Sequence, residues 1–430
     1  MNAICLKYHI FLLTFLLDFS DMKKIILIAF SCFTTLFVAA QNCGNTSTAY
    51  PPVNDLGTGY WNGAQGGLYP NGANVIPAAH MNAGLTIANN IQPLDTAGNT
   101  DASSGWVVWV ALGMSNTTQE SQVFIPMADT FYLKNPKLKL VDCAQGGQAI
   151  VQMLDTTGPF WPTVNTRLAA AGKTAQQVQV VWFKQAEMGP SDTSFTSYPD
   201  ALKNKFKQAV QLCKTKFPNL KICYLSSRIY AGYATTALNP EPFAYYSGWS
   251  VKRLIEDQIN GDTALAFTGP FPRSAWLAWG PYLWADGLIP RSDGLTWVCP
   301  TDFNPDGTHP AMPGRQKVAN LLFNFFSTDT TSVPWFLNNT SVGQNELAKE
   351  ATSTVLYPNP ANDELRIENS EQEIEYVEIS NALGLCFINL KPYVNNRKIL
   401  VMDISALRNG VYFVKLKAEN KISVLKLIKQ

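Results

Sequence analysis

Histidine is scarce in this chain, which has only three such residues among 430, namely His9, His80 and His309. Zinc sites draw their ligands from histidine and from closely spaced cysteines. The eight cysteines of the chain follow no zinc-binding spacing. We therefore expect no metal and no cofactor, and a metal-dependent hydrolase is disfavoured.

Charge is also sparse, since Asp, Glu, Lys and Arg make up 15% of the chain, with 33 basic and 32 acidic residues. Nucleic-acid-binding proteins usually carry a basic excess, so we expect no nucleic acid partner. Residues 41–430 contain no apolar run long enough to span a bilayer. We expect no transmembrane segment in the mature protein, and the composition favours a secreted, loop-rich protein.

The segment 1–40 is typical of a signal peptide region. Met22-Lys23-Lys24 supplies a basic start, residues 25–38 form an apolar run, and Val38-Ala39-Ala40 is a small-residue cleavage site. Met22 is therefore the expected true start of the protein. The alternative is an uncleaved membrane anchor, although the run is short of the ~20 residues that a span requires.

Cysteine outside this segment is compatible with disulfides, because export exposes the chain to an oxidising environment. We expect one or two bridges, and Cys213–Cys223 is the closest pair along the chain. The spacing alone does not determine the connectivity. The candidates are Cys43, Cys143, Cys213, Cys223, Cys299 and Cys386.

Short apolar runs alternate with amphipathic helices over residues 43–336. The runs lie at 107–112, 138–142, 178–183 and 220–225, and the helices lie near 202–217, near 251–259 and after Pro313-Gly314. This alternation predicts a three-layer α/β/α domain with a mostly parallel sheet covered on both faces. Ligands of such sheets bind beyond the carboxyl ends of the strands.

Two candidate catalytic side chains occur where such a sheet predicts them. Ser115 follows the run that ends at Leu112, and His309 precedes the last helix. Imidazole is the usual general base near neutral pH. Asp306, three residues ahead of His309, can accept its other ring N–H and fix the tautomer. The three residue types predict acyl transfer by a serine nucleophile.

The order of motifs over most of residues 105–327 resembles the SGNH hydrolases, a branch of the GDSL esterases. The four blocks are Gly113-Met114-Ser115-Asn116, Ala144-Gln145-Gly146-Gly147, Lys184-Gln185-Ala186-Glu187 and Asp306-Gly307-Thr308-His309. Methionine replaces the aspartate of the family's first block, and the third block lacks the family's asparagine.

The resemblance implies a role for each matching residue. Ser115 is the expected nucleophile, His309 the base and Asp306 the residue that orients it. The oxyanion hole is expected from the backbone N–H groups of Ser115 and Gly147, with the Gln185 amide at the asparagine position.

Aromatic residues gather in 273–299, where Trp276, Trp279, Trp284 and Trp297 occur. Trp279 and Trp284 are candidates for substrate binding, because flat aromatic faces can stack on sugar rings. The alternative is a hydrophobic core beneath a long loop, since large aromatics usually serve cores. Stacking would favour an acylated polysaccharide as the ester substrate.

The C-terminal residues 354–430 alternate like the strands of a small β-sandwich. Tyr357-Pro358-Asn359-Pro360-Ala361, the block 403–415 and the lysine-rich end resemble the C-terminal sorting domain of the type IX secretion system. The resemblance implies that the type IX machinery is a partner and that the protein is exported through the periplasm and across the outer membrane. A carbohydrate-binding β-sandwich is the alternative. Residues 337–353 form the expected linker.

Two hypotheses follow for the protein as a whole. The first is a secreted or cell-surface serine esterase or acetylesterase that hydrolyses esters on acylated carbohydrate. The second is a non-catalytic surface protein that binds glycans on the same fold. The departures in the first and third blocks keep the second hypothesis open.

Overall fold

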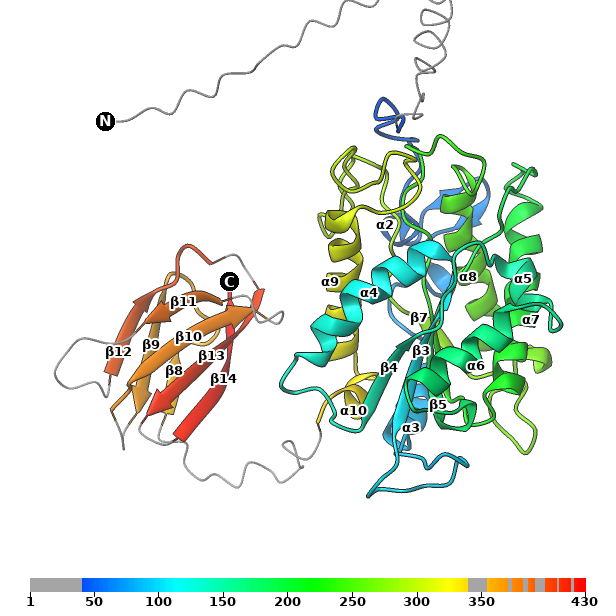
Figure 1. Cartoon of the computed structure of the whole chain (residues 1–430). Coiled ribbons are helices and arrows are strands. Elements are labelled where there is room, and N and C mark those ends of the chain that lie inside the picture. Colours follow the sequence, from blue (N-terminus) through cyan, green and yellow to red (C-terminus); the bar gives the residue numbers. More distant parts are fainter. Residues whose placement is uncertain are drawn as a thin grey trace, which may run out of the picture. The chain divides into compact units, whose positions relative to one another are not determined.

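The computed structural model describes residues 41–338, 354–369, 373–381, 386–390, 399–407, 410–418 and 421–430 (Figure 1). The expected signal peptide and most of the expected linker lie outside these residues, so those assignments stay predictions. Among the described residues, no helix is both long and apolar enough to cross a membrane.

Five parallel strands form the central sheet, in the order β4-β3-β5-β6-β7. Their bounds are β3 Val107–Gly113, β4 Leu138–Asp142, β5 Val178–Lys184, β6 Ile222–Leu225 and β7 Trp276–Trp279. All residues of β3, β5, β6 and β7 are buried. Such continuous apolar strands are typical of a parallel sheet covered on both faces, and they confirm the predicted α/β class.

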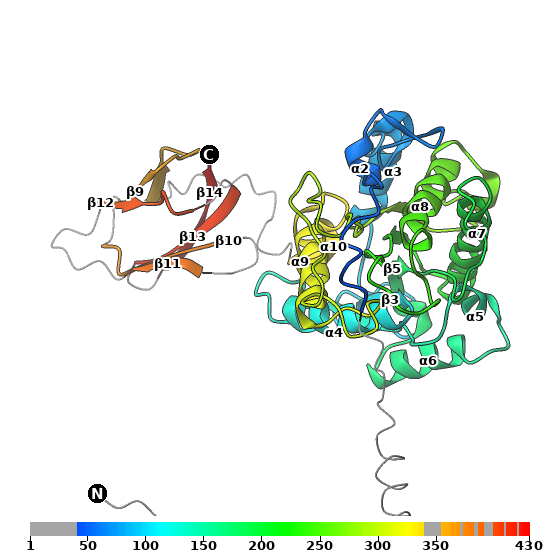
Figure 2. The ribbon, with the colours of Figure 1, turned by 90° about the horizontal axis from the view of Figure 1, so that it is seen from above.

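Helices cover the two faces of the sheet (Figures 1 and 2). On one face, the Trp109 ring of β3 contacts Phe124 of α4 and Phe326 of α9. On the other face, Phe183 of β5 packs edge-on against Phe206 of α7. The longer helices are α3 Ala78–Asn89, α4 Ser115–Asp129, α6 Phe160–Ala170, α7 Tyr198–Lys216, α8 Phe243–Ile259 and α9 Met312–Thr328.

Shorter elements complete this part of the chain. They are α2 Val53–Leu56, β1 Tyr60–Trp61, β2 Ala64–Gln65, η1 Pro70–Gly72, α5 Ile150–Leu154, η2 Ala175–Gln177, η3 Thr263–Leu265 and α10 Val333–Phe336.

The strand order creates a reversal point beside β3. From β3 the chain crosses to β4 on one side, and later returns to β5 on the other side before continuing to β6 and β7. The loops after β3 and β5 therefore diverge at the carboxyl edge of the sheet, which is where open α/β sheets bind ligands. Ser115 follows β3 directly.

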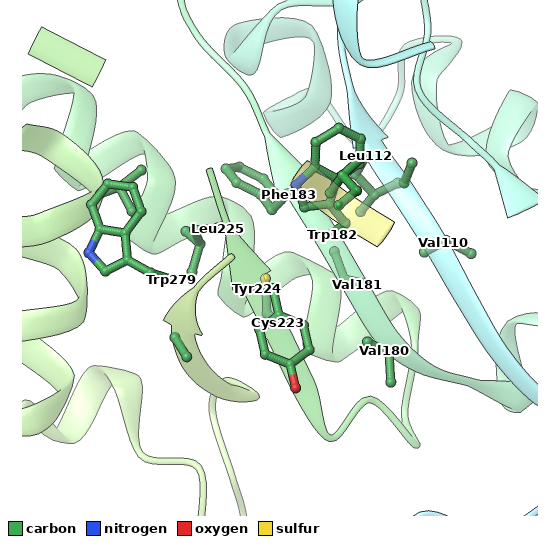
Figure 3. Close-up of a cluster of buried hydrophobic side chains, with 14 of the residues drawn as sticks. Val110, Leu112, Val180, Val181, Trp182, Phe183, Cys223, Tyr224, Leu225 and Trp279 are labelled. Atoms are coloured by element: carbon green, nitrogen blue, oxygen red, sulfur yellow. The ribbon is translucent and has the colours of Figure 1, made fainter. Parts of the chain in front are cut away.

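The hydrophobic core lies on both sides of these strands. Trp182 of β5 stacks on Trp109 of β3 with ring centroids 6.3 Å apart, and both side chains are fully buried. Figure 3 shows Trp182, Tyr224 and Trp279 within one buried cluster. Such interlocking aromatics hold the strands, and hence the loops at their ends, in fixed positions.

One disulfide, Cys43–Cys299, joins the start of the described chain to the segment before α9, with Cα atoms 5.3 Å apart. Cys213 and Cys223, the closest pair along the chain, do not form a bridge, because both residues are free and buried. They lie on α7 and β6, where each packs as a small apolar group.

The C-terminal part forms the predicted β-sandwich from two antiparallel sheets, with strand orders β11-β10-β13-β14 and β12-β9-β8. Leu365 and Ile367 face its core, whereas Glu364 and Arg366 between and beside them are exposed. The strands are β8 Thr354–Tyr357, β9 Glu364–Asn369, β10 Tyr376–Asn381, β11 Cys386–Leu390, β12 Ile399–Asp403, β13 Gly410–Ala418 and β14 Lys421–Lys429.

Candidate active site

Ser115 is the first residue of α4 and lies at the carboxyl end of β3. The first N–H groups of a helix have no partner within the helix, and they carry the positive end of its dipole. No hydrogen bond from the Ser115 N–H is found within the described residues. Its backbone N–H is therefore available to a ligand.

His309 connects Ser115 with Asp306. The Ser115 Oγ–H donates to His309 Nε2 over 2.7 Å. The opposite ring nitrogen, Nδ1, donates to Asp306 Oδ2. A proton on Nδ1 leaves the Nε2 lone pair free to accept the serine proton. The structure thus brings the three sequence-predicted residues into one hydrogen-bonded chain.

A tight turn sets the geometry of Asp306 and His309. Asp306 Oδ1 accepts the N–H groups of Thr308 at 3.0 Å and His309 at 2.9 Å. Gly307 has φ of +63°, and a Cβ there would lie 1.8 Å from the Tyr233 carbonyl oxygen. Only glycine fits this position, which explains the Asp-Gly-Thr-His sequence in local terms.

The ionisation of Asp306 is favoured by the same turn. Partial burial by itself raises the pKa of the Asp306 carboxyl, but hydrogen bonds from the His309 N–H, the His309 ring and the Thr308 N–H outweigh it and hold the pKa below its ordinary value. Asp306 is therefore an anion near neutral pH and can stabilise an imidazolium.

The start of α4 is bound to three neighbouring loops by the residues that follow Ser115. Asn116 Nδ2 donates to the Thr308 carbonyl at 3.0 Å, and Thr117 Oγ1 donates to the Lys184 carbonyl at 2.9 Å. Thr118 Oγ1 donates to the Ala144 carbonyl. These bonds fix the serine relative to the histidine loop and to the ends of β4 and β5.

A cavity of about 260 Å³ opens in front of Ser115 and His309. Gly147 lies in its wall with φ of +72°, and a Cβ added to this glycine would meet no other atom within 4 Å. No hydrogen bond from the Gly147 N–H is found within the described residues. The lining consists of Met114, Ser115, Asn116, Gly147, Met188, Arg228, Leu238, Asn239, Thr308 and His309.

Gln185 does not reach this cavity. Its side chain is buried, its Nε2 donates to the Gln148 carbonyl at 3.0 Å, and its Oε1 accepts the Ala186 N–H at 3.2 Å. These two bonds hold the amide against the loop after β4, and Gln185 is absent from the lining of the cavity. The expected oxyanion role of Gln185 is therefore corrected.

Trp279 and Trp284 do not form a surface for sugar stacking. They are 3% and 0% exposed, and their ring N–H groups donate to the Leu68 carbonyl at 2.7 Å and to Glu241 Oε1 at 2.8 Å. Trp279 belongs to β7, a strand that the sequence analysis does not predict. The core alternative explains these tryptophans, because a buried ring offers no face to a ligand.

Two polar residues of the cavity are absent from the sequence prediction, namely Arg228 and Asn239. Both side chains are buried, at 3% and 1% exposure, yet both line the cavity. Arg228 lies three residues beyond the end of β6, as Ser115 lies beyond Leu112 near the end of β3. Applying the rule of strand ends to every strand would have identified Arg228, whereas nothing in the sequence marks Asn239.

Comparison with protein families identifies the C-terminal part. Residues 355–430 match the family model of the secretion system C-terminal sorting domain. This match confirms the resemblance to the type IX sorting domain. It indicates export across the outer membrane, to the cell surface or beyond, through the type IX machinery.

The remaining comparisons are weaker. No curated protein matches the chain. Among solved structures, a "putative acylhydrolase" from Bacteroides fragilis is similar at 14% identity and a TM-score of 0.30, over 58% of this chain and 96% of that one. An endo-beta-1,4-mannanase from Thermotoga petrophila follows at 9% identity and a TM-score of 0.19, over 81% and 70%. Likenesses of this size carry no argument about activity.

Proposed function

We propose that the α/β part of this exported protein is a serine esterase of the SGNH hydrolase type. The single observation that supports the proposal most is the hydrogen-bonded chain from Ser115 through His309 to Asp306 at the rim of a cavity. In this arrangement a hydroxyl, a base and an orienting carboxylate stand in the order that acyl transfer requires.

In the first half of the reaction, Ser115 Oγ attacks the ester carbonyl while His309 Nε2 takes its proton. Asp306 stabilises the resulting imidazolium, which then gives the proton to the leaving alcohol. In the second half, water attacks the acyl-serine with His309 as base, and the carboxylic acid is released. No other group of the chain needs to change its protonation state.

The developing oxyanion requires hydrogen-bond donors aimed into the cavity. The Ser115 and Gly147 N–H groups are suited to this role, because both are unpaired within the described residues and both residues line the cavity. We assign to Asn239 the role expected for Gln185. Its Nδ2 donates to the Glu187 carbonyl at 3.1 Å and the residue lines the cavity, so its amide is our candidate for the third donor.

The non-catalytic hypothesis requires the aromatic residues to bind glycans, and Trp279 and Trp284 are buried. The departures in the first and third blocks no longer come with a surface for glycan binding. For the same reason the tryptophans no longer favour a carbohydrate substrate.

Hydrolysis of p-nitrophenyl acetate tests the proposed function. We expect wild type to hydrolyse this ester and Ser115→Ala or His309→Ala to lower kcat by at least about 10³-fold, since residues that act as a unit fail together. Ser104→Ala is the matched control, because this serine lies exposed in a loop outside the cavity lining. Equal rates for wild type and Ser115→Ala would refute the proposal.

A further inference from the structure

Arg228 is a buried arginine in the wall of the cavity that contains Ser115 and His309. Its side chain is 3% exposed, and its backbone N–H donates to Ser247 Oγ at 2.9 Å, which anchors the residue at the end of β6. Arginine is rarely buried unless it is paired. A buried guanidinium in this cavity therefore requires a hydrogen-bond acceptor or an anion as partner.

No such partner is supplied by the described part of the chain. Arg228 Nε is buried without a hydrogen bond, and no hydrogen bond or ion pair is found there for the rest of its guanidinium either. A guanidinium carries five N–H donors in a planar fork that matches a carboxylate. The terminal N–H groups of the guanidinium are thus available to a group that enters the cavity.

The nearby carboxylates are already bound elsewhere. Glu120 accepts Lys184 Nζ on both of its oxygens, at 2.5 Å and 2.6 Å, and both side chains are fully buried. Glu241 accepts the Trp284 ring N–H at 2.8 Å and two backbone N–H groups, those of Ala231 at 3.0 Å and Tyr245 at 2.9 Å. Neither carboxylate forms an ion pair with Arg228.

Arg228 has no direct ion-pair partner among these charges. Lys184 and Glu120 neutralise each other as a buried ion pair, which leaves the positive charge of Arg228 without a direct partner among the described residues. Burial also lowers the pKa of Arg228, although the charges of Glu120 and Glu241 oppose this effect. An anion in the cavity would restore both the missing hydrogen bonds and the charge balance.

We propose that Arg228 binds a carboxylate of the substrate, so that the site prefers esters that carry a negative charge close to the scissile carbonyl. This inference rests on the proposed esterase function and adds the substrate class. A bidentate Arg–carboxylate pair fixes orientation as well as charge, and it would hold the ester carbonyl toward Ser115.

The carboxylate could stand on either side of the ester bond. A half-ester of a dicarboxylic acid carries it on the acyl group, and an acetylated uronic acid carries it on the alcohol. The guanidinium can bind the carboxylate in either position. Two pairs of substrates distinguish the two positions. One pair compares the succinate half-ester of 4-methylumbelliferone with its neutral butyrate ester, and the other compares acetylated glucuronic acid with its methyl ester.

The experiment measures kcat/KM for both pairs with wild type, Arg228→Gln and Arg228→Lys. We expect wild type to prefer the anionic member of at least one pair. Arg228→Gln should lower kcat/KM for that member by roughly 10- to 100-fold, as expected for a lost hydrogen bond to a charged group, and change the neutral member less than threefold. Arg228→Lys should recover part of the loss, because it keeps the charge without the fork.

Arg273→Gln is the matched control, since Arg273 is exposed and does not line the cavity; it should behave as wild type. A similar loss for anionic and neutral esters in Arg228→Gln would overturn the proposal, because Arg228 would then serve the fold or the oxyanion. No anionic preference in an active wild type would overturn it as well.

Calorimetry with the Ser115→Ala protein separates this inference from the esterase function, because it needs no turnover. The expected result is tighter binding of the succinate half-ester, or of acetylated glucuronic acid, than of its neutral counterpart. This preference should be lost in Ser115→Ala/Arg228→Gln. Equal binding within both pairs would contradict the inference even if wild type hydrolyses p-nitrophenyl acetate.

Discussion

The two sides of the cavity at Ser115 are built in different ways. On the proton-transfer side, Ser115, His309 and Asp306 are bound to one another, and Asp306 is also bound to its own turn. A second group of residues, which we call the binding side, has donors without partners: Arg228 has an unpaired guanidinium, and the Ser115 and Gly147 N–H groups have no partner within the described residues. The residues of the first side form hydrogen bonds with one another, whereas the second side has hydrogen-bond donors without a partner.

This difference suits two roles, proton transfer on one side and ligand binding on the other. Groups that pass a proton need fixed mutual geometry in the free protein. Groups that bind a developing oxyanion or a substrate carboxylate need open donors that are filled only when the ligand arrives. Substitutions on the first side should therefore reduce the rate for every ester, whereas substitutions on the second side should act according to the ligand.

Asp306→Asn should produce the largest effect that leaves the nucleophile in place. The amide would favour the wrong histidine tautomer, and we expect kcat to fall by about 10³- to 10⁴-fold. Steady-state hydrolysis of p-nitrophenyl acetate measures it. Asp155→Asn is the control, because Asp155 makes a similar turn bond to the Thr157 N–H outside the cavity. If Asp306→Asn lowered kcat less than tenfold, Asp306 would have no role in proton transfer.

Asn239→Ala and Gln185→Ala compare the oxyanion amide that we propose with the one that the sequence predicts. Removing one oxyanion donor costs roughly 10²- to 10³-fold in kcat, and we expect this for Asn239→Ala. Gln185→Ala should lower the melting temperature, through the lost bond to the Gln148 carbonyl, with a much smaller change in kcat. The reverse pattern would show that Gln185 turns into the cavity when substrate binds.

Gly147→Ala should act more weakly on the same side. Alanine at φ of +72° is strained by about 1–3 kcal/mol, and relief of that strain would turn the Gly147 N–H away from the oxyanion. We expect about a tenfold lower kcat, which corresponds to about 1.4 kcal/mol. Gly172→Ala is the control, because Gly172 has φ of +67° and equal space. It should lose stability without losing rate, and equal rate losses would contradict the role of Gly147.

Glu241→Gln should change the pH dependence of stability and leave the rate nearly unchanged. Burial raises the pKa of Glu241 from its ordinary 4.5 to about 7, so the folded protein binds the proton more tightly than the unfolded chain. The contribution of Glu241 to stability is therefore largest below pH 4.5 and is lost as pH rises toward 7. Thermal unfolding from about pH 4.5 to about pH 8 should show a smaller loss in Glu241→Gln, and parallel curves would contradict this.

The sequence predicted those parts of the molecule that depend on local patterns. Asp306 and His309 lie on one turn, and Ser115 follows a strong apolar run, so that their meeting follows from the edge of a parallel sheet. Asn239 lies in the long segment between β6 and α8, where no local pattern fixes its side chain. Its position in the cavity depends on tertiary packing.

The aromatic segment 273–299 shows that composition alone does not predict whether tryptophans are buried or exposed. Trp276–Trp279 is a four-residue strand at the sheet edge, and a short apolar run of this kind does not distinguish a buried strand from other buried or loop-borne segments. The Cys43–Cys299 bridge spans 256 residues, and no spacing rule predicts such a pair. Both features depend on the tertiary fold and not on the local sequence.

Labelling with a fluorophosphonate tests the central claim most directly, namely that His309 activates Ser115 as a nucleophile. The intact protein is treated with the reagent, and the modified peptide is located by mass spectrometry. We predict one adduct on Ser115 in wild type, far slower labelling in His309→Ala and none in Ser115→Ala. No adduct on Ser115, or labelling of wild type and His309→Ala at the same rate, would contradict this claim.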